Sequence, residues 1–556
     1  MTPIARFVRS PSRFRYAVGV VLFLGGLFRL RQYAYNRSLW LDESLLALNI
    51  VHRSWATLFG QLDMNQAAPP GFLFIEKLLI STIAPSDIVL RLYPLLCGLG
   101  LLVLALWVGR LVTTHTGVVT FLLLLASCEK LIFYSSEAKQ YSSDAMFSVV
   151  IIGMAIRLGT ATGWTTILTV GIAGAVVLWF SQPAVFVMAA AALYLVAVRL
   201  DQRKSVLTLV PMFAMWAASF GIVYLFNLSR NVANESLQTF WQAYFMPLPP
   251  TSVAGLRWFL YYPFLAFTDP LSLQFPGLGA FLLVAGSIEL AQDRRRRLLL
   301  ILLLGPIVLT LVASGVHRYP FGLRLLLFLI PILAVLIANG ISFLWRLERG
   351  RGLAVAALAL LLMQPMIESS YRFAKPRDVA EIKTVLAGMQ SQHRANDHVF
   401  VYRRAVPAYR FYADRYGFDE SHTYLEGELP AGTASFEGWY DPLPAHERVW
   451  VVFTFNDPDR VEPELAEYRR LLEAKAHLVD HYLVGAVLNR RTSGRRVCGT
   501  IAGSCLASPD PRRPRDDDGR GRVLSRRDGD AGRQSSAVAD CPGLRGEHGS
   551  PRAGSQ

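Results

Sequence analysis

Long apolar runs separated by short polar segments dominate the first two thirds of the chain. Many of these runs approach the roughly 20 residues that a helix needs to cross about 30 Å of hydrocarbon. A helix is expected because it satisfies its own backbone polar groups in lipid. The pattern predicts an α-helical polytopic membrane protein with about eleven spans, at residues 16–35, 88–111, 117–134, 144–159, 164–180, 184–200, 206–227, 273–290, 298–315, 324–346 and 352–368. A shorter apolar run at 70–83 predicts a segment that lies in the membrane interface.

Composition and charge agree with a membrane protein. Of the 556 residues, 53% are hydrophobic and 17% are charged. Short basic loops stay in the cytoplasm, and the loops on one side of the predicted spans hold Arg6, Arg9, Arg13, Arg15, Arg110, Arg157, Arg199, Arg203, Lys204, Arg294 to Arg297, Arg346, Arg349 and Arg351. We therefore expect a cytoplasmic N-terminus and an extracytoplasmic C-terminal region. The formal charge of +15 reflects this topology, so a nucleic-acid partner is not indicated.

The first span begins after basic residues, as a secretory signal does. No small-residue cleavage site follows it before Arg29 and Arg31. We therefore expect this span to remain in the protein as an anchor.

Composition divides the chain into three parts. Residues 1–370 form the predicted membrane body. Residues 371–492 predict a small extracytoplasmic α/β domain, with strands at 397–402, 448–455 and 481–490 and helices at 406–417 and 462–476. This domain shows no nucleophile constellation or phosphate loop, which favours a packing or docking role. Residues 493–556 are rich in Arg, Gly, Asp, Pro and Ser and predict a disordered tail.

Two neighbouring acids follow the first span, in the segment SLWLDESLLALNI at residues 38–50. Burying a carboxylate near hydrocarbon is costly, so Asp42 and Glu43 indicate a functional site. Asp42 could instead cap an interfacial helix that begins here, a role worth on the order of 1 kcal/mol. A cap needs only one acid, and the presence of two favours chemistry.

A second polar segment, FYSSEAKQYSSDAMF at residues 133–147, lies between the third and fourth spans. On a helix, Glu137, Gln140, Tyr141 and Asp144 would form one stripe, which can face a cavity. The alternative is a solvated helix entry, with Asp144 near the N-terminus of the next span.

A third segment, GVHRYPFGLRLLLFLIP at residues 315–331, links the ninth and tenth spans. It contains His317, Arg318 and Arg324. Arginine at this depth either extends to the lipid headgroups or binds a phosphate through its planar guanidinium group. Taken alone, the segment favours the first of these.

The segments SLWLDESLL, APPGF, YSSEAKQY and HRYPFGLRLLLFLIP occur in that order within residues 1–370. Together they resemble the GT-C glycosyltransferases, in particular the branch of protein O-mannosyltransferases and aminoarabinose transferases. The family pattern of Glu, small residue, Arg, any residue and Tyr matches residues 137–141, with Lys139 at the arginine position. The resemblance implies a GT-C-like fold and a polyprenyl-phosphate sugar donor.

The resemblance also implies roles for individual residues. Asp42 is expected to accept the proton of an acceptor hydroxyl as that hydroxyl attacks the anomeric carbon, with inversion, and Glu43 to hold the acceptor. Lys139, Arg318 or Arg324 would stabilise the departing polyprenyl phosphate. The expected substrate-binding residues are Glu137, Lys139, Tyr141, His317, Arg318 and Arg324.

Other readings stay open on the sequence. A transporter or flippase of a lipid-linked sugar would place ionisable groups near the membrane midplane, whereas the acids here lie at the ends of the spans. An inactive relative could act as a scaffold through its outer domain. Metal dependence stays open: two acids could hold a divalent metal, but lysine or arginine alone could neutralise a lipid phosphate leaving group. The acceptor could be a lipid, a glycan or a protein.

Overall fold

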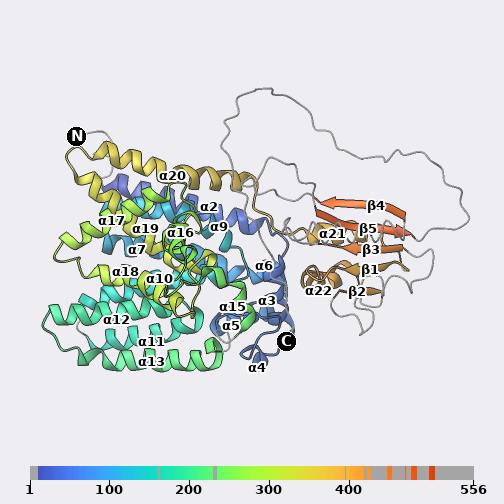
Figure 1. The fold of residues 1–556 in the computed structure, drawn as a ribbon, viewed down its shortest axis with the longest axis horizontal. Helices are drawn as coiled ribbons and strands as arrows, with labels where there is room; N and C mark the ends of the chain where they lie inside the picture. Colours follow the sequence, from blue (N-terminus) through green and yellow to red (C-terminus); the bar gives the residue numbers. More distant parts are fainter. Residues whose placement is uncertain are drawn as a thin grey trace, which may run out of the picture. The chain divides into compact units, whose positions relative to one another are not determined.

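The structure is a computed structural model, and it describes residues 11–160, 163–229, 234–394, 396–418, 422–426, 448–453, 470, 477–484 and 500–507. Most of the predicted helix at 462–476 and most of the predicted tail at 493–556 lie outside these residues. Within the described part, the chain forms a large helical body followed by a small α/β domain (Figure 1).

Helical segments occupy all eleven predicted spans. They are α2 (Pro11–Ala34), α7 (Leu92–Val112), α8 (His115–Ser127) with α9 (Glu129–Tyr134), α10 (Tyr141–Thr160), α11 (Trp164–Phe180), α12 (Ala184–Asp201), α13 (Val210–Val223) with η2 (Tyr224–Leu228), α17 (Pro276–Gln292), α18 (Leu299–Gly315), η4 (Leu323–Leu329) with α19 (Ile330–Arg346), and α20 (Arg351–Ala374). The expected helical membrane architecture is thus confirmed.

Length and composition distinguish two groups among the helices of the described residues. Six segments are long and apolar enough to cross a membrane: Asp87–Val112, Tyr141–Thr160, Ala184–Asp201, Leu207–Leu228, Leu323–Arg346 and Arg351–Ala374. Four apolar helices are shorter: His115–Ser127, Trp164–Phe180, Pro276–Gln292 and Leu299–Gly315. The predicted span at 117–134 is interrupted, because Cys128 adopts an extended backbone between α8 and α9.

Shorter elements connect the spans. They are α3 (Leu41–His52), α4 (Trp55–Leu58), α5 (Pro70–Thr82), α6 (Asp87–Leu90), η1 (Leu207–Leu209), α15 (Glu235–Phe240), η3 (Gln242–Tyr244) and α16 (Val253–Thr268). Helix α5 matches the short apolar run at 70–83. Helix α16 was not predicted, and it exposes apolar side chains such as Leu260 and Tyr261.

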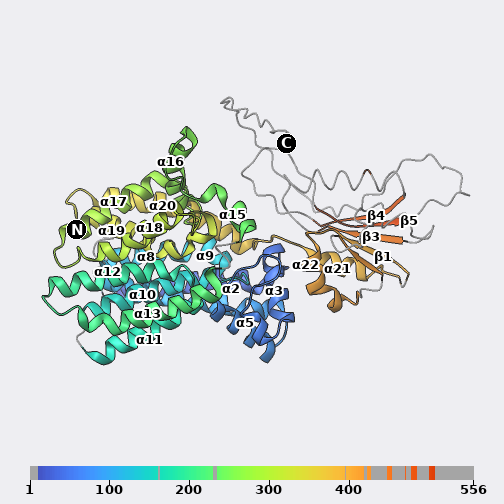
Figure 2. The ribbon, with the colours of Figure 1, turned by 60° about the horizontal axis from the view of Figure 1, so that its bottom comes forward.

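Helix α19 forms the centre of the body. Every residue from Ile330 to Ser342 is buried, and the helix packs against α8, α10, α17 and α20. Helices α10 to α13 run side by side in both views (Figure 1, Figure 2). A helix that is apolar on all sides is expected at such a central position.

Two glycines allow α17 and α19 to approach closely. A Cβ atom on Gly286 would lie 2.1 Å from the backbone oxygen of Leu336. One on Gly340 would lie 2.1 Å from the backbone oxygen of Leu282. Small residues permit this close approach between membrane helices.

The small domain contains a five-stranded sheet in the order β2-β1-β3-β5-β4. Its elements are α21 (Ile382–Gln390), β1 (His398–Val401), α22 (Val406–Tyr412), η5 (Ala413–Tyr416), β2 (Thr423–Leu425), β3 (Arg448–Val452), β4 (His477–Val484) and β5 (Thr500–Ala507). Strand β1 is parallel to β2 and β3, and β5 is antiparallel to β3 and β4. Strand β5 comes from residues after 492 and pairs with β3 and β4.

The close approach of α17 and α19 predicts the effect of a larger residue there. We expect Gly340→Val to destabilise the body by about 1–3 kcal/mol, because the added carbons meet backbone atoms. The measurement is the thermal unfolding midpoint in detergent. Gly352→Val in α20 is the control, since no atom lies within 4 Å of a Cβ added there. Equal midpoints for the two variants would contradict the packing described.

Candidate active site

The two neighbouring acids lie in the first turn of α3, as expected. Negative charge is favourable there because the first amide groups of a helix point toward it. Glu43 also accepts a hydrogen bond from the Trp40 amide at 3.4 Å. Successive helix residues point about 100° apart, so Asp42 and Glu43 face different partners.

The Asp42 carboxylate is shared by two cations from later parts of the chain. Its Oδ1 atom lies 3.1 Å from Lys139 Nζ, and its Oδ2 atom lies 3.1 Å from Arg324 Nη2. Burial would raise the pKa of Asp42, but the charges of Lys139 and Arg324 outweigh it and lower this pKa. Asp42 is thus held as a carboxylate between two positive groups.

Glu43 belongs to a separate, fully buried network. Its carboxylate lies 2.5 Å from Arg37 Nη1 and accepts two hydrogen bonds from Arg91, at 2.9 and 3.0 Å. It also accepts one from the Ala138 amide at 2.8 Å. Burial would raise the pKa of Glu43, but the two guanidinium groups outweigh it and lower this pKa to about 2. The network ties the segment before Lys139 to the start of α3.

The second polar segment contains a loop at residues 135–140. Helix α9 ends at Tyr134 and α10 begins at Tyr141, so Glu137 and Gln140 precede the helix that carries Tyr141. The loop is buried, and Glu43 holds its Ala138 amide. Glu137, Gln140, Tyr141 and Asp144 therefore do not form one helical stripe, because α10 begins only at Tyr141.

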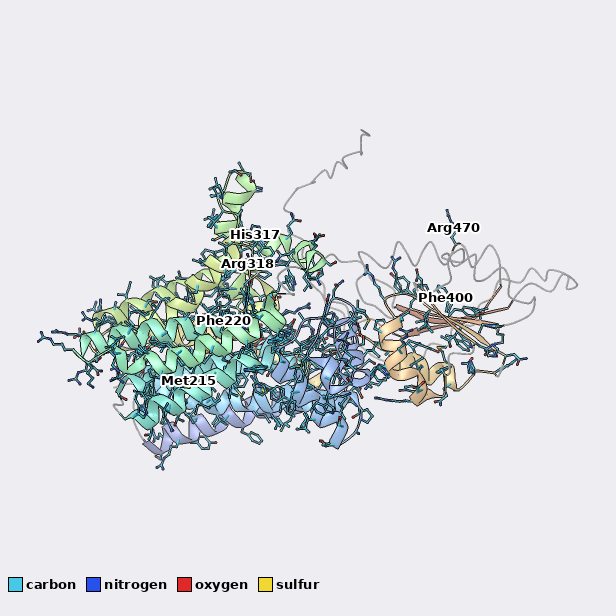
Figure 3. The ribbon with its side chains drawn as sticks, turned by 90° about the horizontal axis from the view of Figure 1, so that it is seen from below. Met215, Phe220, His317, Arg318, Phe400 and Arg470 are labelled. Atoms are coloured by element: carbon cyan, nitrogen blue, oxygen red, sulfur yellow. The ribbon has the colours of Figure 1, made fainter. Side chains whose placement is uncertain are left out.

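One cavity of about 740 Å³ collects residues from all three polar segments. Asp42, Lys139, Tyr141, Arg318 and Arg324 all line it. Figure 3 labels two of its lining residues, Arg318 from the 316–322 loop and Phe220 from α13. The structure thus brings together five of the eight residues that the sequence singled out.

The cavity has a polar part and an apolar wall. The polar part includes Gln66, Gln140 and Gln182 besides the charged residues. The apolar wall comes from α12, α13 and α18 and includes Val185, Phe186, Ala189, Phe220, Leu309 and Val312. Such a cavity suits a ligand with an anionic head and an apolar chain.

Aromatic rings surround Arg324. Its guanidinium carbon lies 5.6 Å from the Trp40 ring centroid, 5.8 Å from that of Tyr141 and 5.5 Å from that of Trp241. Cation–π contacts of this kind orient the group as well as stabilise its charge. Arg324 is therefore held in place rather than extended toward headgroups, the role that the isolated segment favoured.

Three expected site residues do not line the cavity. Glu43 is fully buried in its network, so it cannot contact an acceptor directly in this arrangement. Burial and the Glu43 charge raise the pKa of Glu137 to about 7, and neither Glu137 oxygen has a hydrogen-bond partner among the described residues. The His317 ring packs 4.9 Å from that of Phe245.

Several residues at this site were not recognised from the sequence. Gln66 accepts a hydrogen bond from Lys139 Nζ at 2.7 Å, and Arg91 binds Glu43. Arg91 sits inside a predicted apolar span, where an arginine is itself a sign of function. Trp241 gave no such sign, since single aromatic residues are common in membrane proteins.

The surroundings of Asp42 are cationic rather than suited to a metal. Both of its oxygens already face a positive group. Within the described ranges, no group of three or more His, Cys, Asp and Glu side chains is arranged to hold a metal ion. Charge at this site is balanced by lysine and arginine.

Comparisons with known proteins find similarity in structure but not in sequence. No family model and no curated protein matches the chain. The structure of ArnT from Cupriavidus metallidurans bound to undecaprenyl phosphate matches with a TM-score of 0.47 and 13% identity, over 89% of this chain and 98% of that one.

A second match is the archaeal oligosaccharyltransferase AglB from Archaeoglobus fulgidus, in complex with an inhibitory peptide and a dolichol-phosphate. Its TM-score is 0.43 and its identity 12%, over 79% of this chain and 69% of that one. At these TM-scores and identities, the function proposed below rests on the residues of the cavity.

The buried network predicts a large cost for neutralising Glu43. We expect Glu43→Gln to destabilise the protein by about 3–5 kcal/mol, because Arg37 and Arg91 would remain buried without their counter-charge. Thermal unfolding in detergent measures this. The control is Asp63→Asn, which breaks the ion pair between Asp63 and Arg53. The Asp63 side chain is 65% exposed, and exposed ion pairs contribute at most about 1 kcal/mol. A Glu43→Gln midpoint equal to that of the control would exclude the proposed structural importance of the network.

Proposed function

We propose that this protein is an inverting glycosyltransferase. It moves a sugar from a polyprenyl-phosphate donor to an acceptor hydroxyl on a lipid, a glycan or a protein. The proposal places the reaction at the outer face of the cytoplasmic membrane, with the N-terminus in the cytoplasm and the small domain outside. The observation that supports it best is a single cavity in which an acid paired with two cations adjoins an apolar wall.

The donor fits this cavity by its chemistry. Its phosphate is a strong acceptor for Arg324 and Lys139, and the planar guanidinium group can form two parallel hydrogen bonds with it. Arg318 adds a third positive group to the same cavity. The polyprenyl chain would lie along the apolar residues of α12, α13 and α18.

The ion pairs of Asp42 suggest how the donor prepares the base. A bound phosphate competes with the Asp42 carboxylate for Lys139 and Arg324. Once these cations turn to the phosphate, Asp42 is released to accept a hydrogen bond from the acceptor hydroxyl. The base is therefore available when the donor is in place, which limits the reaction to the complete complex.

The chemical step then follows from the positions of these groups. The acceptor oxygen bonds to the anomeric carbon, and its proton moves to Asp42. The bond between that carbon and the phosphate oxygen breaks, and the electron pair leaves with the polyprenyl phosphate. Lys139 and Arg324 stabilise the charge that develops on this oxygen. Glu43 acts as a positioning residue, since it holds the loop that carries Lys139.

Asp42→Asn tests the assignment of the base. We expect transfer to fall by about 10²- to 10⁴-fold, while the variant still enters the membrane. The assay follows label from a radiolabelled polyprenyl-phosphate hexose into acceptors of permeabilised cell membranes. Asp63→Asn, an acid outside the cavity lining, is the matched control. Full transfer by Asp42→Asn would refute this role.

The same assay separates an enzyme from a transporter or a scaffold. Only an enzyme converts the donor to polyprenyl phosphate. Wild-type protein that binds the donor and leaves it intact in the presence of acceptor membranes would overturn the proposed function.

Arg324→Gln tests the phosphate site without any sugar. We expect its affinity for polyprenyl phosphate in nanodiscs to fall at least about tenfold, because a charge-assisted hydrogen bond contributes about 1.5–3 kcal/mol. Arg349→Gln, an exposed arginine outside this cavity, controls for general attraction of anions. Unchanged affinity in the folded Arg324→Gln variant would place the phosphate elsewhere.

A further inference from the structure

Neutral amide side chains gather at the polar end of the cavity. Five of them line it: Asn65, Gln66, Gln140, Gln182 and Gln238. Gln66 accepts a hydrogen bond from Lys139, and Gln182 donates one to Asn227 Oδ1 at 2.8 Å. Asn65 accepts one from Asn234 at 3.0 Å, and Gln238 donates one to the His317 backbone oxygen at 3.3 Å. Gln140 differs.

The Oε1 atom of Gln140 is buried and has no hydrogen-bond partner among the described residues. The residue as a whole is 9% exposed. A buried acceptor left without a donor is costly, and native proteins rarely leave one without a reason. Because Gln140 lines the cavity, a ligand group can supply the missing hydrogen bond.

Gln140 lies beside the reacting groups. It follows Lys139 and precedes Tyr141, and both of these also line the cavity. Lys139 contacts Asp42 and is the proposed partner of the donor phosphate. A group that binds Gln140 is therefore close to the phosphate and to the base, where the sugar of the donor must lie.

The charges around the cavity limit which sugars fit. Among the described residues that line it, Asp42 is the only acid, and the bases are Lys139, Arg318 and Arg324. Without donor, Asp42 is paired with two of these bases, and in the proposed complex the acceptor hydroxyl occupies it as its base. An ammonium group on the sugar would need a carboxylate of its own, because burying an unpaired charge is costly.

We propose that the transferred sugar is uncharged and that Gln140 recognises one of its hydroxyl groups. This inference rests on the proposed function and names the class of sugar that the cavity accepts. An amide suits this task because it offers both an acceptor and donors to a hydroxyl. Amino sugars and uronic acids are disfavoured, the first by the lack of a free acid and the second by competition with the phosphate for the same cations.

Binding in nanodiscs tests the proposal with four probes. These are polyprenyl phosphate alone and polyprenyl phosphate carrying a neutral hexose, an amino sugar or a uronic acid. We expect the neutral hexose donor to bind the wild-type protein most tightly. Gln140→Ala should weaken binding of this donor about three- to tenfold, the effect of one lost hydrogen bond, and leave polyprenyl phosphate alone unchanged.

Two further variants sharpen the test. Gln140→Glu keeps the shape and adds a carboxylate, so it should shift preference toward the amino sugar donor. Gln202→Ala, at an exposed position after α12 and outside the cavity, is the control. Thermal unfolding establishes that each variant is folded.

The outcomes separate this inference from the proposed function. Failure of wild-type protein to bind polyprenyl phosphate would contradict the proposed function itself. Binding of polyprenyl phosphate with a wild-type preference for the amino sugar or uronic acid would overturn only the assignment of the sugar. Equal loss for the hexose donor and for polyprenyl phosphate alone in Gln140→Ala would overturn the role of Gln140.

Discussion

The arrangement of the site depends on one carboxylate shared by two cations. Asp42 lies 3.1 Å from both Lys139 and Arg324, and these residues come from three segments far apart in the sequence. The triple contact joins the start of α3, the loop before α10, and η4, which leads into the central α19. An acid that is partly buried between two cations is stable as a carboxylate, and any anion that competes for those cations changes its surroundings. Recognition of a phosphate and availability of the base are therefore coupled.

A second set of charges supports the first without joining it. Glu43, Arg37 and Arg91 are almost completely buried, and together with the Ala138 amide they fix the loop that presents Lys139. The adjacent residues Asp42 and Glu43 thus have different roles, one in the cavity and one in the buried network, because a helix directs successive side chains to different sides. Buried pairs of this kind add little net stability compared with apolar packing. Their contribution here is the position of a cation at the cavity.

The sequence predicted the architecture well and the site in part. Hydrophobic runs mark the spans because each span must be apolar along its length, and all eleven appear as helical segments. The convergence of Asp42, Lys139 and Arg324 was anticipated from the order of the motifs. Local patterns did not show that Glu43 turns away from the cavity or that residues 135–140 form a loop. Both depend on contacts between residues far apart in the sequence, Arg91 with Glu43 and the Ala138 amide with Glu43. Gln140 was visible only as part of a polar stripe, and its unpaired oxygen is a property of the tertiary structure.

An experimental structure with bound polyprenyl phosphate tests the central claim most directly. The account predicts the phosphate within hydrogen-bond distance of Arg324 and Lys139, the chain along α12, α13 and α18, and the Asp42 carboxylate no longer paired with both cations. A phosphate bound outside this cavity, with both ion pairs of Asp42 intact, would contradict it.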